Sequence, residues 1–277
     1  MKSFHIYAFS DEAGSGLGEQ IAALKRNSLE GMEIRTVDKK NVSDMLPDEV
    51  KEIRKALDAE GLRVRSVGSP IGKMKMAEDY SAHLDKFKRT LESANILGAD
   101  RMRIFSFYIP KGEDPEDYRD TVIDRLGEML EIAKACGVTL CHENEKGIYG
   151  DIASRCEKLH KALPRLRAVF DPANFIQCGQ PTLEAFEALN GYIDYLHIKD
   201  SLPDGRIVPA GMGAGEVEEI LRRTKSVYLT VEPHLKVFDG FAGLQQESSL
   251  EGIKIYPDNA SAFDDACEHL KALTAKL

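Results

Sequence analysis

The sequence predicts a single (β/α)₈ barrel, or TIM barrel, that spans residues 1–277 as one domain. Short apolar runs alternate with helix-like segments eight times without interruption. The length of 277 residues also suits such a barrel, which typically takes about 250 residues. An open doubly wound sheet is the alternative, but it usually carries a glycine-rich phosphate loop after its first strand. The corresponding loop here, SDEAGSGLGEQ, is acidic and favours the barrel.

The first half of the chain contains four predicted strand–helix units. Apolar alternation predicts strands at 4–9, 31–35, 63–68 and 100–107. Helical spacing predicts helices at 19–26, 47–59, 80–97 and 115–136. Pro47 suits a first helical turn, and Gly98 and Gly137 are expected to end their helices. These features indicate a regular repeat of strand and helix.

The second half repeats this scheme and adds one long connection. Strands are expected at 138–143, 165–171, 192–200 and 227–232. Helices are expected at 151–163, 182–189, 215–225 and 260–277. The segment 235–259 follows the last strand and has no repeat of its own. We expect it to be a lid, a partner contact or a surface loop packed by its own aromatic side chains.

Four side chains that commonly bind metals stand at the ends of the last four predicted strands. They are Glu143, Asp171, His197 and Glu232. The carboxyl ends of parallel strands converge on one face of a barrel, where active sites are built. Carboxylates with one imidazole suit a divalent ion such as Mn²⁺, Mg²⁺, Co²⁺ or Zn²⁺. We therefore expect one divalent metal at this face.

The alternation of side chains along these strands supports an inward orientation for the four residues. Glu143 shares its parity with Cys141, and His197 shares its parity with Tyr195. The neighbouring positions are mostly apolar and are expected to face the helices. His142 is an exception, because it is polar on the outward parity.

Several stretches together resemble the xylose isomerase-like TIM barrels, the group usually labelled sugar phosphate isomerase/epimerase. These stretches are HENEKGIYGD, FDPANF, HIKD, PAGMGAGEV and VEPHL, with FSDEAG, VGSPIGK and RIFSFYIP earlier in the chain. The resemblance covers nearly the whole chain and implies a metal held by Glu143, Asp171, His197 and Glu232. The chain departs from the family at Asn174, where epimerases of the tagatose type often carry a histidine.

Such a site supports proton transfer on a hydroxy-carbonyl compound. A divalent ion that chelates the carbonyl acidifies the adjacent C–H and stabilises the enediolate that forms. We expect Glu143 and Glu232 to be catalytic, with Lys199 as a cation near the reacting oxygens. Return of the proton to the opposite face gives an epimer, and its return to the adjacent carbon gives an isomer. A strand-end salt bridge with Asp200 or Asp171 is the alternative for Lys199.

Five further residues are expected to contact the substrate. They are Arg35, Ser69, Arg103, Asn174 and His234. Together with Lys73, the two arginines are candidates for holding a carboxylate or a phosphate. Arg35 pairing with Glu33, a barrel ion pair for Arg103 and an exposed loop for His234 are the structural alternatives. Glycines at 211, 213 and 215 stand where barrels often bind phosphate, but acidic residues follow them.

These observations favour a metal-dependent isomerase or epimerase of carbohydrate metabolism, with manganese among the candidate ions, acting on a small-molecule sugar or polyol. A keto-inositol-type dehydratase on the same scaffold is the alternative. A DNA-repair endonuclease is more remote, because it needs three metal ions and more histidines than the seven present.

The net charge of −9 opposes binding to nucleic acid or to an anionic membrane. The five cysteines form no CxxC pair, and the N-terminal segment does not resemble a signal peptide. We expect a cytoplasmic protein and leave a homo-oligomer open.

Overall fold

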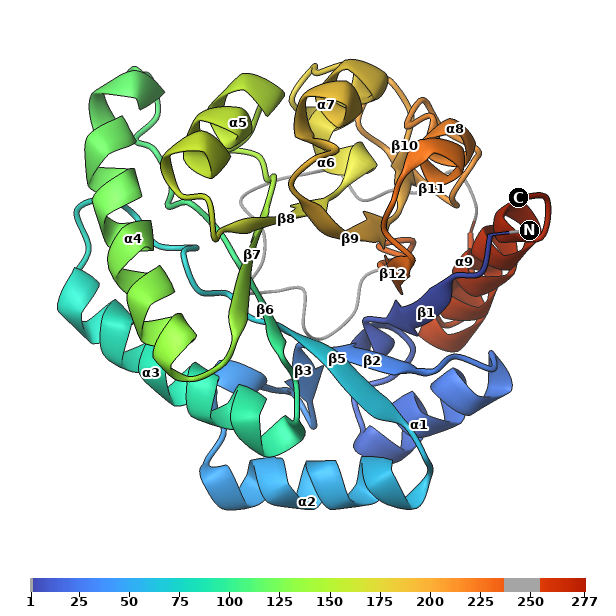
Figure 1. Cartoon of the computed structure of the whole chain (residues 1–277). Helices are drawn as coiled ribbons and strands as arrows, with labels where there is room; N and C mark the ends of the chain where they lie inside the picture. The colour runs from blue at the N-terminus through green and yellow to red at the C-terminus, as the bar shows by residue number, and fades with distance from the viewer. Residues whose placement is uncertain (1, 237–254) are drawn as a thin grey trace.

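A closed parallel barrel confirms the predicted (β/α)₈ fold. The computed structural model describes residues 2–236 and 255–277. Eight strands hydrogen-bond in the closed order β1-β12-β9-β8-β7-β6-β5-β2 (Figure 1). Their bounds are His5–Ala8 (β1), Gly31–Ile34 (β2), Arg63–Gly68 (β5), Arg101–Ile104 (β6), Thr139–Glu143 (β7), Arg167–Phe170 (β8), Ile193–Ile198 (β9) and Tyr228–Val231 (β12).

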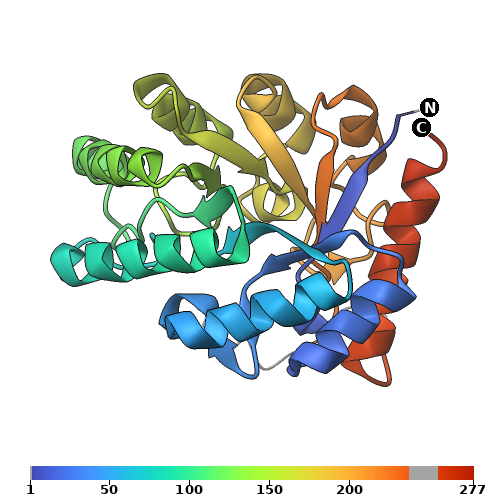
Figure 2. The ribbon, with the colours of Figure 1, turned by 60° about the horizontal axis from the view of Figure 1, so that its bottom comes forward.

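The helices surround this barrel on its outside (Figures 1 and 2). They are Leu17–Arg26 (α1), Pro47–Ala59 (α2), Tyr80–Leu97 (α3), Arg119–Ala135 (α4), Ala153–Ala162 (α5), Pro172–Gln177 (α6), Thr182–Leu189 (α7), Val217–Arg223 (α8) and Asn259–Thr274 (α9). Helices α2, α3 and α7 have the predicted bounds. As expected, Gly98 ends α3 in the left-handed conformation, with φ of 69°.

Short elements account for the differences between the expected and observed structure. Within the described residues, two 3₁₀ turns, Ser10–Glu12 (η1) and Val42–Asp44 (η2), and two hairpins were not predicted. The predicted helix 115–136 begins as a 3₁₀ turn, Pro115–Tyr118 (η3), before α4. The hairpins pair Thr36–Val37 (β3) with Lys40–Asn41 (β4), and Asp200–Ser201 (β10) with Ile207–Val208 (β11). Helix α6 was also not predicted, because six residues are too few to show a helical period.

The predicted division between a polar barrel interior and an apolar exterior is present. In the interior, Ser66, Tyr195 and Thr230 hydrogen-bond to Glu33, whereas Leu140 belongs to the main apolar core. His142 points away from this interior, and its Nε2 lies 2.9 Å from Ser106 Oγ. Burial lowers the pKa of His142 to about 3, so the outward histidine is neutral near pH 7.

The two ends of the described chain lie side by side (Figure 2). Lys2 N donates to Leu277 O there at 3.3 Å. Residues 237–254 lie outside the described residues, so the role expected for the segment 235–259 stays a prediction. At its described edges, Lys236 Nζ donates to Tyr256 O at 3.2 Å. Across residues 2–236 and 255–277, no helix combines the length and the apolar character that a bilayer crossing requires.

Candidate active site

The barrel brings the four predicted metal-binding residues together. Glu143 ends β7, Asp171 follows β8, His197 lies in β9 and Glu232 follows β12. One ligand atom from each residue lies within 4.8 Å of the others. All four side chains are buried. Their convergence follows from the shared direction of the parallel strands, whose carboxyl ends meet at one face.

Glu33 on β2 orients His197. The Nε2 atom of His197 lies 3.0 Å from Glu33 Oε2, and the same carboxylate accepts hydrogen bonds from Tyr195 Oη at 2.8 Å and Thr230 Oγ1 at 2.9 Å. A proton on Nε2 that is donated to Glu33 leaves the Nδ1 lone pair available. Such a carboxylate–histidine contact is the usual support for a metal-ligating imidazole. The role of Glu33 in orienting His197 was not predicted from the sequence.

The donor atoms suit a divalent cation. The Nδ1 atom of His197 lies 3.2 Å from Glu143 Oε1 and 3.2 Å from Glu232 Oε2. Among the described residues, His197 Nδ1 is buried without a hydrogen bond, which is costly for a polar atom. Three carboxylates and one imidazole form the oxygen and nitrogen set that Mn²⁺, Mg²⁺ or Zn²⁺ accepts.

Protons occupy this cluster when no metal does. Burial opposes a charged imidazole, but Glu143, Glu33 and Glu232 raise the pKa of His197 well above its usual value. Burial raises the pKa of Asp171 to about 7, although Lys199 opposes the shift. Both residues must lose a proton to become ligands, so metal binding competes with protonation.

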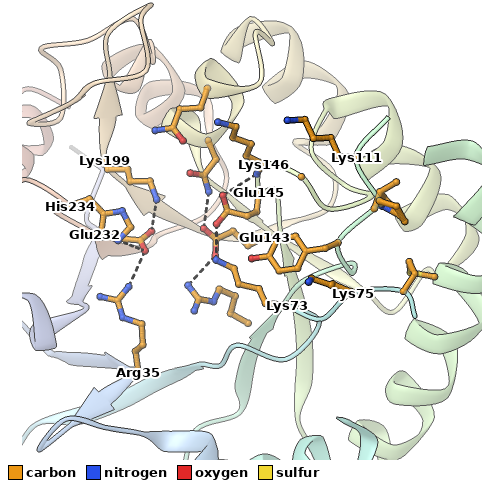
Figure 3. Close-up of a pocket in the computed structure, with 18 of the residues that line it drawn as sticks. Arg35, Lys73, Lys75, Lys111, Glu143, Glu145, Lys146, Lys199, Glu232 and His234 are labelled. Atoms are coloured by element: carbon orange, nitrogen blue, oxygen red, sulfur yellow. Dashed lines mark hydrogen bonds and ion pairs between the residues drawn. The ribbon is translucent and has the colours of Figure 1, made fainter. Parts of the chain in front are cut away.

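Three side chains hold the two glutamates from the flanks. Arg103 Nη1 donates to Glu143 Oε2 at 3.1 Å, and Asn174 Nδ2 donates to Glu143 Oε1 at 3.1 Å. Lys199 Nζ donates to Glu232 Oε2 at 3.0 Å (Figure 3). It also lies 2.9 Å from Asp171 Oδ2. Despite burial, His197 and Arg103 lower the pKa of Glu143 to about 2. Both expectations for Lys199, a place near the reaction and a salt bridge with Asp171, are compatible with this position.

The partners of Arg35 do not include Glu33, which was the pairing considered from the sequence. It makes two hydrogen bonds of 2.9 Å to Asp11 and one of 3.0 Å to Glu12, and its Nη1 lies 3.3 Å from Glu232 Oε1. Pairing with Glu33 was therefore wrong, because closure of the barrel directs Glu33 toward His197. The roles of Asp11 and Glu12 were not predicted, since both lie in a loop that looked merely acidic.

His234 also belongs to the site and does not lie in an exposed loop. Its backbone N–H donates to Glu12 Oε2 at 2.6 Å, and its Nε2 lies 3.3 Å from Glu232 Oε1. Its φ of 47° is in the left-handed region, which is uncommon for residues other than glycine and often marks functional positions.

Ser69 is placed differently from the other expected substrate contacts. It is fully buried, and its Oγ donates to Arg103 O at 2.6 Å while accepting from Ile71 N at 3.3 Å. Ser69 does not line the cavity described below. Its hydroxyl is committed to the backbone of the β5 and β6 connections, so direct contact with a substrate stays a prediction that this geometry does not favour.

A cavity of about 600 Å³ opens above these groups (Figure 3). Its lining includes the predicted residues Arg35, Lys73, Arg103, Glu143, Asn174, Lys199, Glu232 and His234. The volume suits a small molecule. The lining also includes Lys75, Lys111, Lys146 and Glu145, which were not predicted because exposed charged loop residues give no distinctive pattern.

The glycine-rich loop after β9 binds a carboxylate of the chain itself. The backbone N–H groups of Gly211, Gly213 and Gly215 donate to Asp200 at 3.0, 3.0 and 2.8 Å. A side chain at Gly213 or Gly215 would collide with this carboxylate. The amides that in many barrels bind phosphate are therefore already occupied, in agreement with the acidic residues of this loop.

Comparison with known proteins places the chain among similar barrels. The first of three solved structures is the IOLI protein with a bound zinc atom, which has a TM-score of 0.75 and 16% identity and covers 100% of this chain and 99% of that one. The second is the probable 3-DHS dehydratase AsbF from Bacillus anthracis, with a TM-score of 0.73, 15% identity and 99% coverage of both chains. The third is the 3-keto-D-glucoside 4-epimerase YcjR from E. coli, with a TM-score of 0.69, 16% identity and coverage of 99% and 100%.

Comparison with curated proteins gave no match. The family model described as xylose isomerase-like TIM barrel matches residues 21–272, which confirms the resemblance found in the sequence. The chain therefore belongs to the xylose isomerase-like TIM barrel family.

Proposed function

We propose that the protein is a divalent-metal-dependent isomerase or epimerase of a sugar or keto-polyol. The observation that carries the proposal is the placement of Glu143 and Glu232, each 3.2 Å from His197 Nδ1. Two carboxylates that share a position for a cation and also line a small-molecule cavity are the groups that proton transfer beside a carbonyl needs. The solved structure titled as a keto-glucoside epimerase has the same fold.

A divalent ion, which Glu143, Asp171, His197 and Glu232 would hold, would supply Lewis-acid polarisation of the substrate carbonyl. Glu143 or Glu232 accepts the proton from the adjacent carbon at a carboxylate oxygen, and an enediolate forms. Arg103 and Asn174 fix the orientation of Glu143, whereas Arg35 and Lys199 fix that of Glu232. The other glutamate takes up a proton from solvent and delivers it to the opposite face of the enediolate to give an epimer, while the first releases its proton to solvent.

The electrostatics of the cluster support this assignment of bases. His197 and Arg103 keep the pKa of Glu143 at about 2 despite burial. Lys199, His234 and His197 hold the pKa of Glu232 well below its usual value, again against burial. Both carboxylates are therefore ionised near neutral pH and able to accept a proton. Because they are weak bases, the substrate C–H must be strongly acidified, which is the contribution expected of the metal.

Dehydration of a keto-inositol-type compound is the second candidate. It begins with the same proton removal and then needs a proton donor for the departing hydroxyl group. Lys199 lines the cavity beside Glu232 and is the available cation. Its pKa is raised by Asp171 and Glu232, although burial opposes this, so Lys199 holds its proton tightly.

A DNA-repair endonuclease with three metal ions is disfavoured. In the described ranges, the one further group of potential ligands is Glu12, Glu232 and His234. Arg35 contacts both glutamates of that group, at 3.0 and 3.3 Å, and its guanidinium already supplies the positive charge there. The group also shares Glu232 with the main site.

Product analysis in deuterated water tests the proposal. The protein, loaded in turn with Mn²⁺, Mg²⁺, Co²⁺ or Zn²⁺, is incubated with a panel of ketoses and keto-inositols. An isomerase or epimerase should give products of unchanged composition that carry one solvent deuterium at the carbon beside the carbonyl. Loss of one water from the product would instead establish the dehydratase. Absence of exchange with every ion and compound would contradict both.

A further inference from the structure

The active-site cavity is rich in positive charge although the chain as a whole is acidic. Seven cationic side chains line the described part of the cavity: Arg35, Lys73, Lys75, Arg103, Lys111, Lys146 and Lys199. Three carboxylate side chains line it as well: Glu143, Glu145 and Glu232. The net charge of the whole chain is −9. This local excess of cations runs against the composition and calls for a physical reason.

The deeper cations are paired with carboxylates. Arg35 pairs with Asp11, Arg103 with Glu143, and Lys199 with Asp171. Lys73 is also paired, because its Nζ lies 2.9 Å from Glu145 Oε2. The positive charge of these four side chains is offset by the carboxylates that they contact, so little of it remains for a ligand.

Lys75, Lys111 and Lys146, which we call the lysine rim, differ from these four cations. Their side chains are exposed, and none of them forms an ion pair with another residue of the described ranges. Figure 3 shows the rim on the side of the cavity next to Glu145, away from Arg35 and His234. Lysine offers only hydrogen-bond donors, and three ammonium groups that line one cavity favour an anion there.

The rim is built on one connected backbone wall. Its lysines come from the connections that follow β5, β6 and β7. Phe107 N donates to Gly72 O at 2.9 Å and Tyr108 N to Met74 O at 2.8 Å, which joins the first two connections. Ile109 N donates to Gly147 O at 3.0 Å, which joins the third connection to the second. The three lysines therefore form one surface of the cavity and do not belong to independent loops.

We propose that the substrate carries an anionic group, a carboxylate or a phosphate, which the lysine rim binds while the hydroxy-carbonyl end meets Glu143 and Glu232. This inference rests on the proposed function. A cationic wall beside a low-dielectric cavity raises the local concentration of anionic substrates and rejects cationic ones. The glycine amides after β9 are occupied by Asp200, so the rim is the available place for such a group.

Three probes with one reactive head test the proposal. Fructose, fructuronate and fructose 6-phosphate share a hydroxy-ketone and differ only in the group at the far end. Binding to the Mn²⁺-loaded protein is measured by calorimetry, and solvent-deuterium exchange is measured in parallel. We expect both anionic probes to bind about 10-fold or more tightly than fructose, since each exposed charge pair contributes modestly. Whichever anionic probe binds more tightly identifies the preferred group as a carboxylate or a phosphate.

The variant Lys75→Gln/Lys111→Gln/Lys146→Gln should remove this preference. It should weaken binding of the anionic probes by about 10-fold and leave fructose within about twofold. Added salt should also weaken the binding of the anionic probes, because it screens exposed charges. The matched control is Lys51→Gln/Lys55→Gln/Lys88→Gln, which removes the same charge from exposed positions on α2 and α3.

The outcomes separate this proposal from the proposed function. Equal or undetectable binding of all three probes, or equal effects of the rim and control variants, would overturn the anionic substrate. Deuterium exchange into fructose at the rate seen with the anions would do so as well, while supporting the proton-transfer function. Preferential binding of the anions, with no exchange into any compound of the wider panel, would leave the rim in place and contradict the proposed function.

Discussion

Cationic side chains lie at two depths of the same cavity, and the two sets differ in burial and in ion pairing. Arg35, Arg103 and Lys199 are buried, and each is held by carboxylates at 2.9 to 3.3 Å. The lysine rim is exposed and makes no ion pair within residues 2–236 and 255–277. The difference indicates a division of labour, in which the deep groups shape the chemistry and the rim selects the molecule.

The energetic consequences also differ between the two depths. Removing one partner of a buried ion pair typically costs about 3–5 kcal/mol, because a charge is left without compensation. An exposed pair contributes about 0–1 kcal/mol. Substitutions at the deep site should therefore change metal content, turnover and often stability together, whereas those at the rim should change only the affinity for anions.

The largest effect is expected from Asp171→Ala. This change removes one ligand and leaves Lys199 with Glu232 as its remaining carboxylate partner, so metal content and activity should fall together. Turnover should drop by more than about 100-fold, beyond what loss of an outer hydrogen bond to a ligand costs. Metal analysis and deuterium exchange measure the two effects. Asp204→Ala, at an exposed carboxylate paired with Arg206, is the control. Full metal occupancy in the Asp171 variant would show that Asp171 is not a ligand.

A smaller effect is expected from Glu33→Gln, which leaves all four ligands in place. The amide keeps an acceptor oxygen but loses the negative charge beside His197 Nε2. Metal affinity should fall by about 10- to 100-fold, as is typical when the partner of a ligating histidine is changed. Ser66→Ala removes a 3.3 Å hydrogen bond to the same carboxylate and a 3.0 Å hydrogen bond with Tyr195 Oη, but it leaves the negative charge in place and should have little effect. Metal titration of both variants measures this, and equal affinities would remove Glu33 from the account.

The pH dependence of metal binding is the most gradual of these effects. Burial raises the pKa of Asp171 to about 7, so below that pH the carboxyl group is increasingly protonated and a metal must displace its proton. Affinity should therefore fall as the pH drops from about 8 to about 6. His197, whose pKa lies well above its usual value, should release a proton on binding throughout this range, and Asp171 should add a second in the lower half. Calorimetry in buffers of different ionisation enthalpy measures the release. Affinity that stays constant over this interval would place the pKa of Asp171 elsewhere.

The extent to which the sequence predicted the site follows from where its information lies. Each metal ligand ends its own strand, so a local pattern of apolar run and polar terminus was sufficient to find it. Glu33 orients His197 only because closure of the barrel brings β2 and β9, strands that lie far apart along the chain, to the same interior. Asp11 and Glu12, the partners of Arg35, were missed because they lie in a loop that looked merely acidic. The rim lysines looked like ordinary solvated loop residues until the paired connections placed them together.

The central claim is that Glu143 and Glu232 move a proton on a substrate held beside the metal. Glutamine at either position keeps an oxygen ligand and removes the basic group. With metal-loaded Glu143→Gln and Glu232→Gln, solvent-deuterium exchange at the substrate carbon should fall by about 10²–10⁴-fold while much of the metal is retained. Exchange at the wild-type rate in both variants would contradict the claim.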